Sequence, residues 1–208
     1  MKVAVVIPAY NEERNIGQVL RVLVPVEAVD DIIVVSDGSR DATADTARRY
    51  RRVKVIELER NRGKGAAMMA GARATDAEVI LFLDADLVGL RRHHVLAMLA
   101  PVVSGQADMA VGVFDEGRLA TDLAQKLAPQ LSGQRALRRE LLEKVPGLEE
   151  AGFGVEIALS RYAEKCGARV VRVPLRNVAQ VMKEEKSGLW RGLRDRARMY
   201  WEIIKAFR

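Results

Sequence analysis

The chain has 208 residues, of which 49% are apolar and 30% are charged, and its formal net charge is +6. This apolar content is enough for a globular core, and no apolar run reaches the roughly 18 residues of a spanning helix, so the composition argues against a wholly disordered chain and against a membrane-spanning one. The positive charge favours phosphate-bearing partners: nucleotides, phosphorylated small molecules, anionic lipids or nucleic acid.

The start of the chain and its cysteine content both indicate a cytoplasmic protein. Residues 1–10 enter a strand pattern directly, without the apolar core and cleavage site of a signal peptide. The single Cys166 cannot form an internal disulfide, which suits a reducing compartment. Few aromatic residues lie among the arginines, and those at 48–52 are expected on a solvated helix face, so we expect no nucleic-acid partner.

Strands and helices are expected to alternate through the first half of the chain. Residues 3–8 and 32–35 are continuous apolar runs, typical of buried parallel strands, and further strands are expected at residues 53–58, 79–86 and 107–114. Helical patterns lie between them, at residues 11–23, from about residue 41, and at 63–75 and 94–103. This alternation predicts an α/β fold with a mainly parallel sheet and helices on both faces.

The alternation ends near Phe114. Residues 115–136 carry turn signals and helical pieces but no strand, and they precede helices at 137–145 and 154–167 and a last strand at 169–175. We expect one domain over residues 1–182, with halves 1–115 and 116–182, and then a basic amphipathic helix at 183–208.

The apolar face of this last helix carries Trp190, Tyr200 and Trp201 beside several arginines. Such a stripe packs on the domain, forms a homodimer, or rests on the inner face of an anionic membrane.

The segment ILFLDADLVG, residues 80–89, places two aspartates one residue apart at the end of an apolar run. Side chains repeat every two residues along a strand, so Asp84 and Asp86 are expected on one side of it. Two such carboxylates are costly to bury without a cation, and hard oxygen ligands suit Mg²⁺ or Mn²⁺, which also bind phosphates. The structural alternative is that Asp86 caps the next helix and Asp84 fills a turn.

Two further loops belong to the same edge of the predicted sheet. Asp37 ends the second strand in an Asp-Gly-Ser turn, and the loop at residues 61–65 precedes a helix. Its glycines permit close backbone approach, the helix N-terminus favours anions, and Lys64 adds a positive charge. Functional groups just beyond the carboxyl ends of parallel strands are where open α/β sheets bind ligands.

Taken in order, the motifs IPAYNEE, VVSDGSRDAT, NRGKGAAMMAGARAT and ILFLDADL resemble those of family 2-like glycosyltransferases, which use nucleotide-diphosphate sugars. The resemblance covers about the first 115 residues. It implies the GT-A (nucleotide-diphospho-sugar transferase) fold. A nucleotidyltransferase is less favoured, because residues 8–12 replace its Gly-rich signature.

The resemblance also implies roles for single residues. Asp37 would accept the N–H of a uracil-like base, Lys64 would sit near the base or ribose, and Asp84 would contact the ribose. Asp86 would hold the metal that bridges the diphosphate of a UDP- or GDP-linked sugar. The residues implied to border the nucleotide after the first strand are Pro8, Ala9, Tyr10 and Glu12.

Residues 131–145 and 153–159 resemble the acceptor half of glucosyl-3-phosphoglycerate synthase-type retaining glycosyltransferases. By that likeness, Ser132, Gly133 and Arg135 would lie near the acceptor, and Gly154 and Glu156 would lie beside the reacting carbon, with Glu156 as the catalytic carboxylate. From the residues alone, Glu156 is equally a charge that stabilises a helix N-terminus.

Departures from that pattern leave alternatives open. Such relatives carry a metal-binding histidine where this chain reads Asn177-Val178-Ala179-Gln180, and Gln180 would be a weak ligand.

The adjacent His93 and His94 diverge around a helix, so a structural role is favoured.

The sequence therefore leaves three functions open: hexose transfer to a phosphorylated small molecule, inverting transfer to a polyprenyl phosphate, and nucleotide-sugar binding without catalysis.

Overall fold

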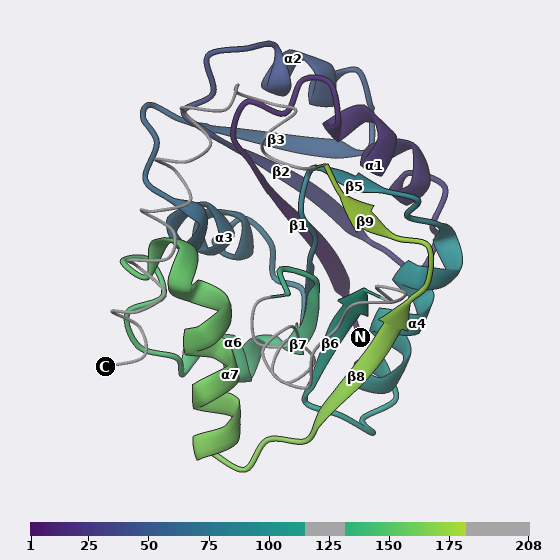
Figure 1. Cartoon of the computed structure of the whole chain (residues 1–208), viewed down its shortest axis with the longest axis vertical. Coiled ribbons are helices and arrows are strands. Elements are labelled where there is room, and N and C mark those ends of the chain that lie inside the picture. Colours follow the sequence, from purple (N-terminus) through teal and green to yellow (C-terminus); the bar gives the residue numbers. More distant parts are fainter. Residues whose placement is uncertain (115–131, 182–208) are drawn as a thin grey trace.

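The computed structural model describes residues 1–114 and 132–181, and their main feature is a seven-stranded sheet (Figure 1). The strand order is β3-β2-β1-β4-β7-β6-β8. The strands are β1 Val3–Ala9, β2 Asp31–Asp37, β3 Val53–Leu58, β4 Val79–Phe82, β6 Met109–Phe114, β7 Arg135–Arg138 and β8 Val170–Leu175. All pair in parallel except β7, so the expected mainly parallel sheet is confirmed.

Helices cover both faces of the sheet, as the alternating pattern predicts. They are α1 Ile16–Leu23, α2 Thr43–Arg48, α3 Lys64–Arg73, α4 Arg92–Val103, α6 Arg139–Glu143 and α7 Val155–Lys165, with a 3₁₀ turn η1 at Gly152–Gly154. None of these helices is long and apolar enough to cross a membrane. The expected amphipathic helix at 183–208 lies outside the described residues.

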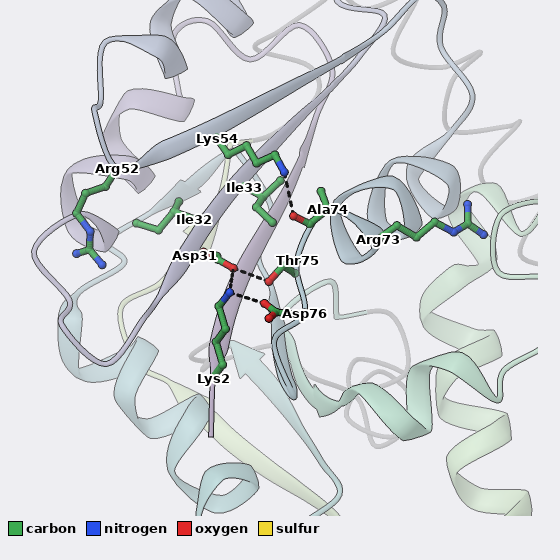
Figure 2. A pocket seen from close by; sticks show the side chains of 10 residues that line it. All are labelled: Lys2, Asp31, Ile32, Ile33, Arg52, Lys54, Arg73, Ala74, Thr75 and Asp76. Atoms are coloured by element: carbon green, nitrogen blue, oxygen red, sulfur yellow. Dashed lines mark hydrogen bonds and ion pairs between the residues drawn. The ribbon is translucent and has the colours of Figure 1, made fainter.

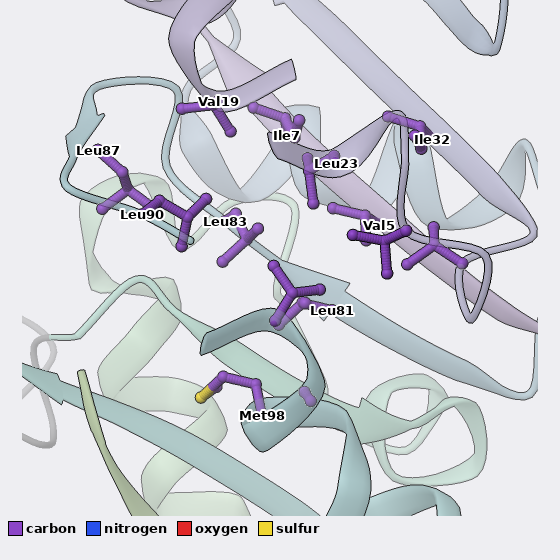
Figure 3. Close-up of a cluster of buried hydrophobic side chains, with 14 of the residues drawn as sticks. Val5, Ile7, Val19, Leu23, Ile32, Leu81, Leu83, Leu87, Leu90 and Met98 are labelled. Carbon is purple, nitrogen blue, oxygen red and sulfur yellow. The ribbon is translucent and has the colours of Figure 1, made fainter. Parts of the chain in front are cut away.

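Two apolar clusters form the core, one on each face, because successive strand residues point to opposite sides. On one face Val5 and Leu81 of the sheet pack with Leu23 of α1 (Figure 3). On the other face Val6 of β1 packs with Met68 of α3. The apolar runs in the sequence are continuous because both faces of the central strands are covered.

The strand β7 was not expected. It lies antiparallel between β4 and β6, with the sequence Arg-Ala-Leu-Arg, which lacks the β-branched run that identifies a strand. The helix expected over 137–145 begins only at Arg139, whose guanidinium donates to the carbonyl oxygens of Ala72, Thr75 and Ala77. This bonding anchors the end of β7 to the loop before β4.

Two further expectations of element length were wrong. The first helix begins at Ile16 rather than near Asn11, because Asn11 adopts a left-handed backbone (φ 56°) and residues 10–15 form a loop. Strand β4 ends at Phe82, so Asp84 and Asp86 lie in the following turn. The expectation that both lie on one side of a strand was therefore wrong. The next helix starts only at Arg92, so Asp86 does not cap it.

That turn leads into a small second sheet, which was also unexpected. β5 (Leu87–Val88) pairs antiparallel with β9 (Ala179–Gln180), and Gln180 lies opposite Leu87. Gly89 is required at the turn after β5, because it has φ +77° and a Cβ would lie 2.0 Å from the carbonyl oxygen of Asn177. This pairing places residues 179–180 next to the turn that holds Asp84 and Asp86.

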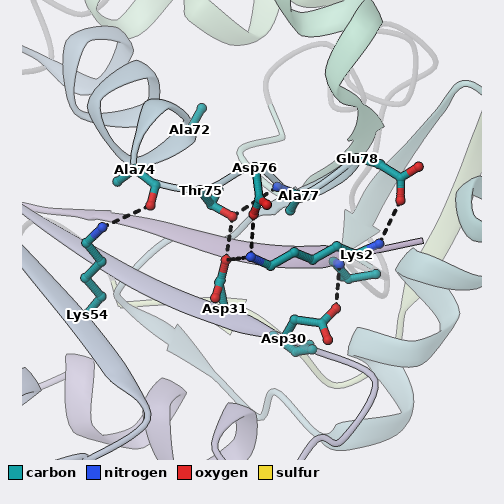
Figure 4. Close-up of polar contacts among 12 residues, drawn as sticks. Lys2, Asp30, Asp31, Lys54, Ala72, Ala74, Thr75, Asp76, Ala77 and Glu78 are labelled. Atoms are coloured by element: carbon teal, nitrogen blue, oxygen red, sulfur yellow. Dashed lines mark hydrogen bonds and ion pairs between the residues drawn. The ribbon is translucent and has the colours of Figure 1, made fainter.

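The amino ends of the parallel strands are held by charged contacts (Figure 4). Lys2 forms ion pairs with Asp31 and Asp76, and Thr75 donates to Asp31. An open hollow of about 550 Å³ lies here, and Lys2, Arg52, Lys54 and Arg73 are its cationic lining residues (Figure 2). All four already bond to carboxylates or carbonyl oxygens of the fold. These contacts indicate a structural role.

His94 has the structural role favoured from the sequence. Its side chain is buried at the start of α4, and Nδ1 accepts a hydrogen bond of 3.1 Å from the backbone N–H of Arg91. Burial, together with His93 and Arg91, lowers the pKa of His94 below 6.5, although the backbone of Arg176 opposes the shift.

A lowered pKa means that the fold favours neutral His94, so its contribution to stability is complete above about pH 6.5 and is lost as the pH falls through the lower value in the fold. We expect the melting temperature of His94→Asn, which keeps an acceptor for Arg91, to fall less between pH 7.5 and pH 5 than that of the parent. Thermal melts at several pH values measure this difference, and parallel curves would contradict it.

Candidate functional site

The loops that follow β1 and β2 are joined at the carboxyl edge of the sheet. Arg40 donates its backbone N–H to the side chain of Asn11, and Glu12 donates its backbone N–H to Thr43. Of the residues predicted after the first strand, Ala9 is buried, while Tyr10 is 46% exposed and faces solvent. Glu12 also accepts a bond from the Asn15 amide at 2.8 Å. The loops therefore form one fixed wall with an exposed aromatic ring.

Asp37 organises the neighbouring loop. Its two carboxylate oxygens accept the backbone N–H groups of Arg62 (2.7 Å) and Gly63 (2.9 Å). Burial raises the pKa of Asp37 above its ordinary value, although these two bonds oppose the shift. Gly38 must be glycine here, since a Cβ at its φ of +65° would lie 2.4 Å from the backbone nitrogen of Asn61. Asp37 thus fixes the loop that delivers Lys64, and each oxygen retains acceptor capacity for a ligand N–H.

Lys64 lies between two carboxylates from distant parts of the chain. Its Nζ is 2.5 Å from Asp84 Oδ1 and 2.6 Å from Glu156 Oε1. The side chains are 18%, 12% and 8% exposed, respectively. Burial alone would lower the pKa of Lys64, but the two carboxylates outweigh it and raise the pKa above the ordinary value. Lys64 therefore joins the expected donor half of the site to the expected acceptor half.

Asp84 is held on its other side by two amides. Gln134 Nε2 donates to Asp84 Oδ2 at 2.7 Å, and the Gln180 amide donates to the same oxygen. Neither glutamine was predicted to bind Asp84. The signal for Gln180 was its place after the last strand, whereas nothing in the sequence marks Gln134, because its burial depends on the unpredicted strand β7.

The predicted acceptor residues lie beside this cluster. Ser132 is buried and its hydroxyl donates to the carbonyl oxygen of Gly112. Arg135 has no exposed surface, and its Nε donates to the Ser132 carbonyl oxygen at 3.0 Å. Burial lowers the pKa of Arg135 to about 10, and the negative charge of Glu156 opposes this shift. Arg135 is thus placed to hold Ser132 and to act on Glu156 electrostatically, rather than to touch a ligand directly.

Glu156 stands in the first turn of α7, after Gly154 at its N-cap. A carboxylate at this position interacts favourably with the helix dipole, which is the structural role considered for Glu156 from the sequence. Glu156 also pairs with Lys64. Glu156 thus has a structural partner in Lys64 and a position at the start of a helix next to the rest of the cluster.

Asp86 is half-buried in the turn between β4 and β5, and its carbonyl oxygen accepts the backbone N–H of Val181. Within residues 1–114 and 132–181, no three His, Cys, Asp or Glu side chains gather as a metal site. Asp84 is bonded to Lys64, Gln134 and Gln180, and Asp86 is the residue to which the sequence resemblance assigns the cation. The donor set suits an ion that arrives with phosphate oxygens of its own.

Gly133 lies directly against the charged cluster. A Cβ at this position would be 2.3 Å from Asp84 Oδ2 and 2.6 Å from Lys64 Nζ. We expect Gly133→Ala to displace Asp84 and to cost about 1–3 kcal/mol in the free energy of unfolding, as overpacking usually does. Denaturant unfolding measures this loss. Gly167→Ala is the control, since nothing lies within 4 Å of a Cβ there, although its φ of +68° adds some strain. Equal losses in the two variants would contradict the expectation.

Comparison with known proteins decides the family. The profile of Glycosyl transferase family 2 matches residues 4–158. The chain belongs to glycosyl transferase family 2. This match confirms the family expected from the four motifs in the first half of the chain.

The most similar curated family 2 relatives include glucosyl-3-phosphoglycerate synthases. The protein from Mycobacterium tuberculosis is 31% identical over 193 residues, which cover 76% of this chain and 59% of that protein. Dolichol-phosphate mannosyltransferase from Pyrococcus furiosus is 27% identical, with 84% of this chain and 56% of that protein covered. The chain thus spans under two thirds of the length of these relatives.

Solved structures give the same fold. Glucosyl-3-phosphoglycerate synthase from Mycobacterium tuberculosis, in complex with Mn²⁺, UDP and glucosyl-3-phosphoglycerate, matches with a TM-score of 0.81 and 27% identity, and the match covers 99% of this chain and 78% of that one. The same enzyme was also solved with Mg²⁺ and UDP. The GT-A fold predicted from the sequence is therefore confirmed.

Proposed function

We propose that this chain transfers a hexose, with glucose as the first candidate, from a UDP-linked donor to a small phosphorylated acceptor, with the help of Mg²⁺ or Mn²⁺. The observation that carries the proposal is the Lys64 bridge between Asp84 and Glu156. It joins the edge of the sheet proposed to bind the nucleotide to a second carboxylate within one mostly buried cluster. The ligands in the similar structures supply the donor and acceptor classes.

The donor would bind along the wall formed by the loops after β1 and β2. Asp37 would accept an N–H of the base, and the exposed ring of Tyr10 would border the nucleotide. Asp84 would accept a ribose hydroxyl at Oδ1, because Oδ2 already accepts the two amides of Gln134 and Gln180 while Oδ1 accepts Lys64. Pro8 and Ala9, the last two residues of β1, and Glu12 in the following loop would supply backbone contacts rather than charged ones.

A divalent cation would bind beside Asp86. One carboxylate plus substrate phosphate oxygens is the usual environment of Mg²⁺, and Gln180 is brought next to the motif by the pairing of β5 with β9. Bound there, the cation would stabilise the negative charge that the nucleoside diphosphate gains as it leaves. Asp86 would hold the ion, and Gln180 would orient Asp84.

The acceptor would approach between the diphosphate and the N-terminus of α7. Ser132 and Gly133 would line this side, and Glu156, paired with Lys64 in the first turn of α7, would face the reacting carbon. A carboxylate there would stabilise positive charge at the reacting carbon. A polyprenyl phosphate remains the alternative acceptor, and the likeness to dolichol-phosphate mannosyltransferase supports it.

The test is a transfer assay with UDP-glucose and Mn²⁺, in which 3-phosphoglycerate and a polyprenyl phosphate are offered separately. We expect a glucosylated product from phosphoglycerate, loss of product when Mn²⁺ is chelated, and no product from the lipid. Product from the lipid alone would make the lipid-phosphate function correct. Nucleotide binding without any transfer would favour the non-catalytic binding module.

A further inference from the structure

Gln134 is a buried polar side chain whose amide is aimed at the candidate site. It has no exposed surface, and its Nε2 donates to Asp84 Oδ2 at 2.7 Å. Burying an amide costs free energy of folding unless its hydrogen bonds are satisfied. Its bond to a carboxylate of the site suggests that it serves more than packing.

The backbone around Gln134 is fixed on both sides. Its carbonyl oxygen accepts the N–H of Gly112 at 2.8 Å, and its own N–H donates to Ser132 Oγ at 3.3 Å. The next residue begins β7, which is paired with β4 and with β6. Gln134 is therefore attached to the same sheet as strand β4, which leads into Asp84. This attachment fixes the positions of the two residues relative to each other.

The two oxygens of Asp84 are held differently. Oδ1 faces the ammonium group of Lys64, which also pairs with Glu156, whereas Oδ2 accepts the amides of Gln134 and the exposed Gln180. Lys64 alone would leave the carboxylate free to rotate about its Cβ–Cγ bond. The buried amide opposite Lys64 removes that freedom without adding a charge.

We propose that Gln134 is a positioning residue that fixes the Asp84 carboxylate in the orientation that binds the donor nucleotide. This inference rests on the proposed function, in which Asp84 contacts the donor nucleotide. Loss of Gln134 should therefore lower the affinity for the donor rather than the rate of the chemical step. Gln134→Met keeps the volume and removes the donor. We expect it to weaken binding of UDP with Mn²⁺ about tenfold, the usual effect of losing one bond to a charged group.

A double-mutant cycle tests whether Gln134 acts through Asp84. Dissociation constants for UDP with Mn²⁺ are measured by calorimetry for the parent, Gln134→Met, Asp84→Asn and the double variant. We expect the Gln134→Met change to have under about a twofold effect in the Asp84→Asn background, because residues in one network are not additive. Gln106→Met, at an exposed position after α4, is the matched control and should bind as the parent does.

A second variant keeps the inference testable if Gln134→Met does not fold. Gln134→Glu has the same shape but places a carboxylate against Asp84, so it should weaken binding more than Gln134→Met does. In the Asp84→Asn background, which removes the opposed charge, Gln134→Glu should weaken binding less than it does in the parent. Equal losses from Gln134→Met in both backgrounds, or equal losses from Gln134→Glu in both backgrounds, would overturn the role of Gln134. Failure of the parent itself to bind any nucleotide diphosphate would instead refute the proposed function.

Discussion

Replacing Lys64 with methionine is expected to lower the free energy of unfolding by about 3–5 kcal/mol, the usual loss when one partner of a buried ion pair is removed. The substitution leaves Asp84 and Glu156, both mostly buried, next to each other without the cation that now separates them. For a chain of this length the loss corresponds to a melting temperature lower by about 6–20 °C. Thermal and urea unfolding at pH 7.5 measure it.

Two further variants identify the cause of that loss. Adding Glu156→Gln to Lys64→Met removes one of the opposed charges, so part of the stability should return. Lys165→Met, at an exposed position in α7, should change the unfolding free energy by less than about 0.5 kcal/mol. If Lys64→Met is no more harmful than Lys165→Met, the ion-pair cluster does not hold the two halves of the site together.

Glu156→Gln is expected to reduce the rate of hexose transfer by about 10²- to 10³-fold, as the loss of one preorganised electrostatic group commonly does. The amide has nearly the same shape and still accepts a hydrogen bond from Lys64, but it lacks the negative charge that would stabilise the reacting carbon. Steady-state kinetics with UDP-glucose should show a lower kcat with little change in the KM of the donor.

The matched control is Glu164→Gln, on the exposed face of the same helix, which should leave kcat unchanged. Binding of UDP with Mn²⁺ to the Glu156→Gln variant should remain within about threefold of the parent, since Glu156 is not expected to touch the nucleotide. A variant that keeps its full kcat would leave Glu156 with only its structural roles at the start of α7.

Much of the fold could be predicted because the buried parallel strands are strongly apolar. The run at 32–35 corresponds to the core of β2, and Ile16, Val19, Leu20 and Leu23 form the buried stripe of α1, as their spacing predicts. β7 and β9 could not be predicted in the same way. Each is short and is defined by its partners: β7 by the gap between β4 and β6, and β9 by two residues of β5.

The candidate site was predictable as a set of residues but not as a set of contacts. Asp37, Lys64 and Asp84 follow strands or precede a helix at one edge of the sheet, so their convergence follows from topology. The pairing of Lys64 with Glu156 spans 92 positions of sequence, from 64 to 156, and depends on where α7 packs. The role of Gln134 depends on β7, so no local pattern in the sequence could reveal it.

The edge of the sheet that carries Asp37, Asp84 and Asp86 is proposed to bind a nucleotide diphosphate together with a divalent cation. The most direct test compares the melting temperature with UDP, with Mn²⁺, and with both, for the parent and for Asp86→Asn. Saturation at about a hundred times the dissociation constant adds roughly 2.7 kcal/mol, which is easily detected. We expect a large upward shift in melting temperature only when UDP and Mn²⁺ are both present, and the loss of that shift in Asp86→Asn. No shift in the parent, or an equal shift in Asp86→Asn, would contradict it.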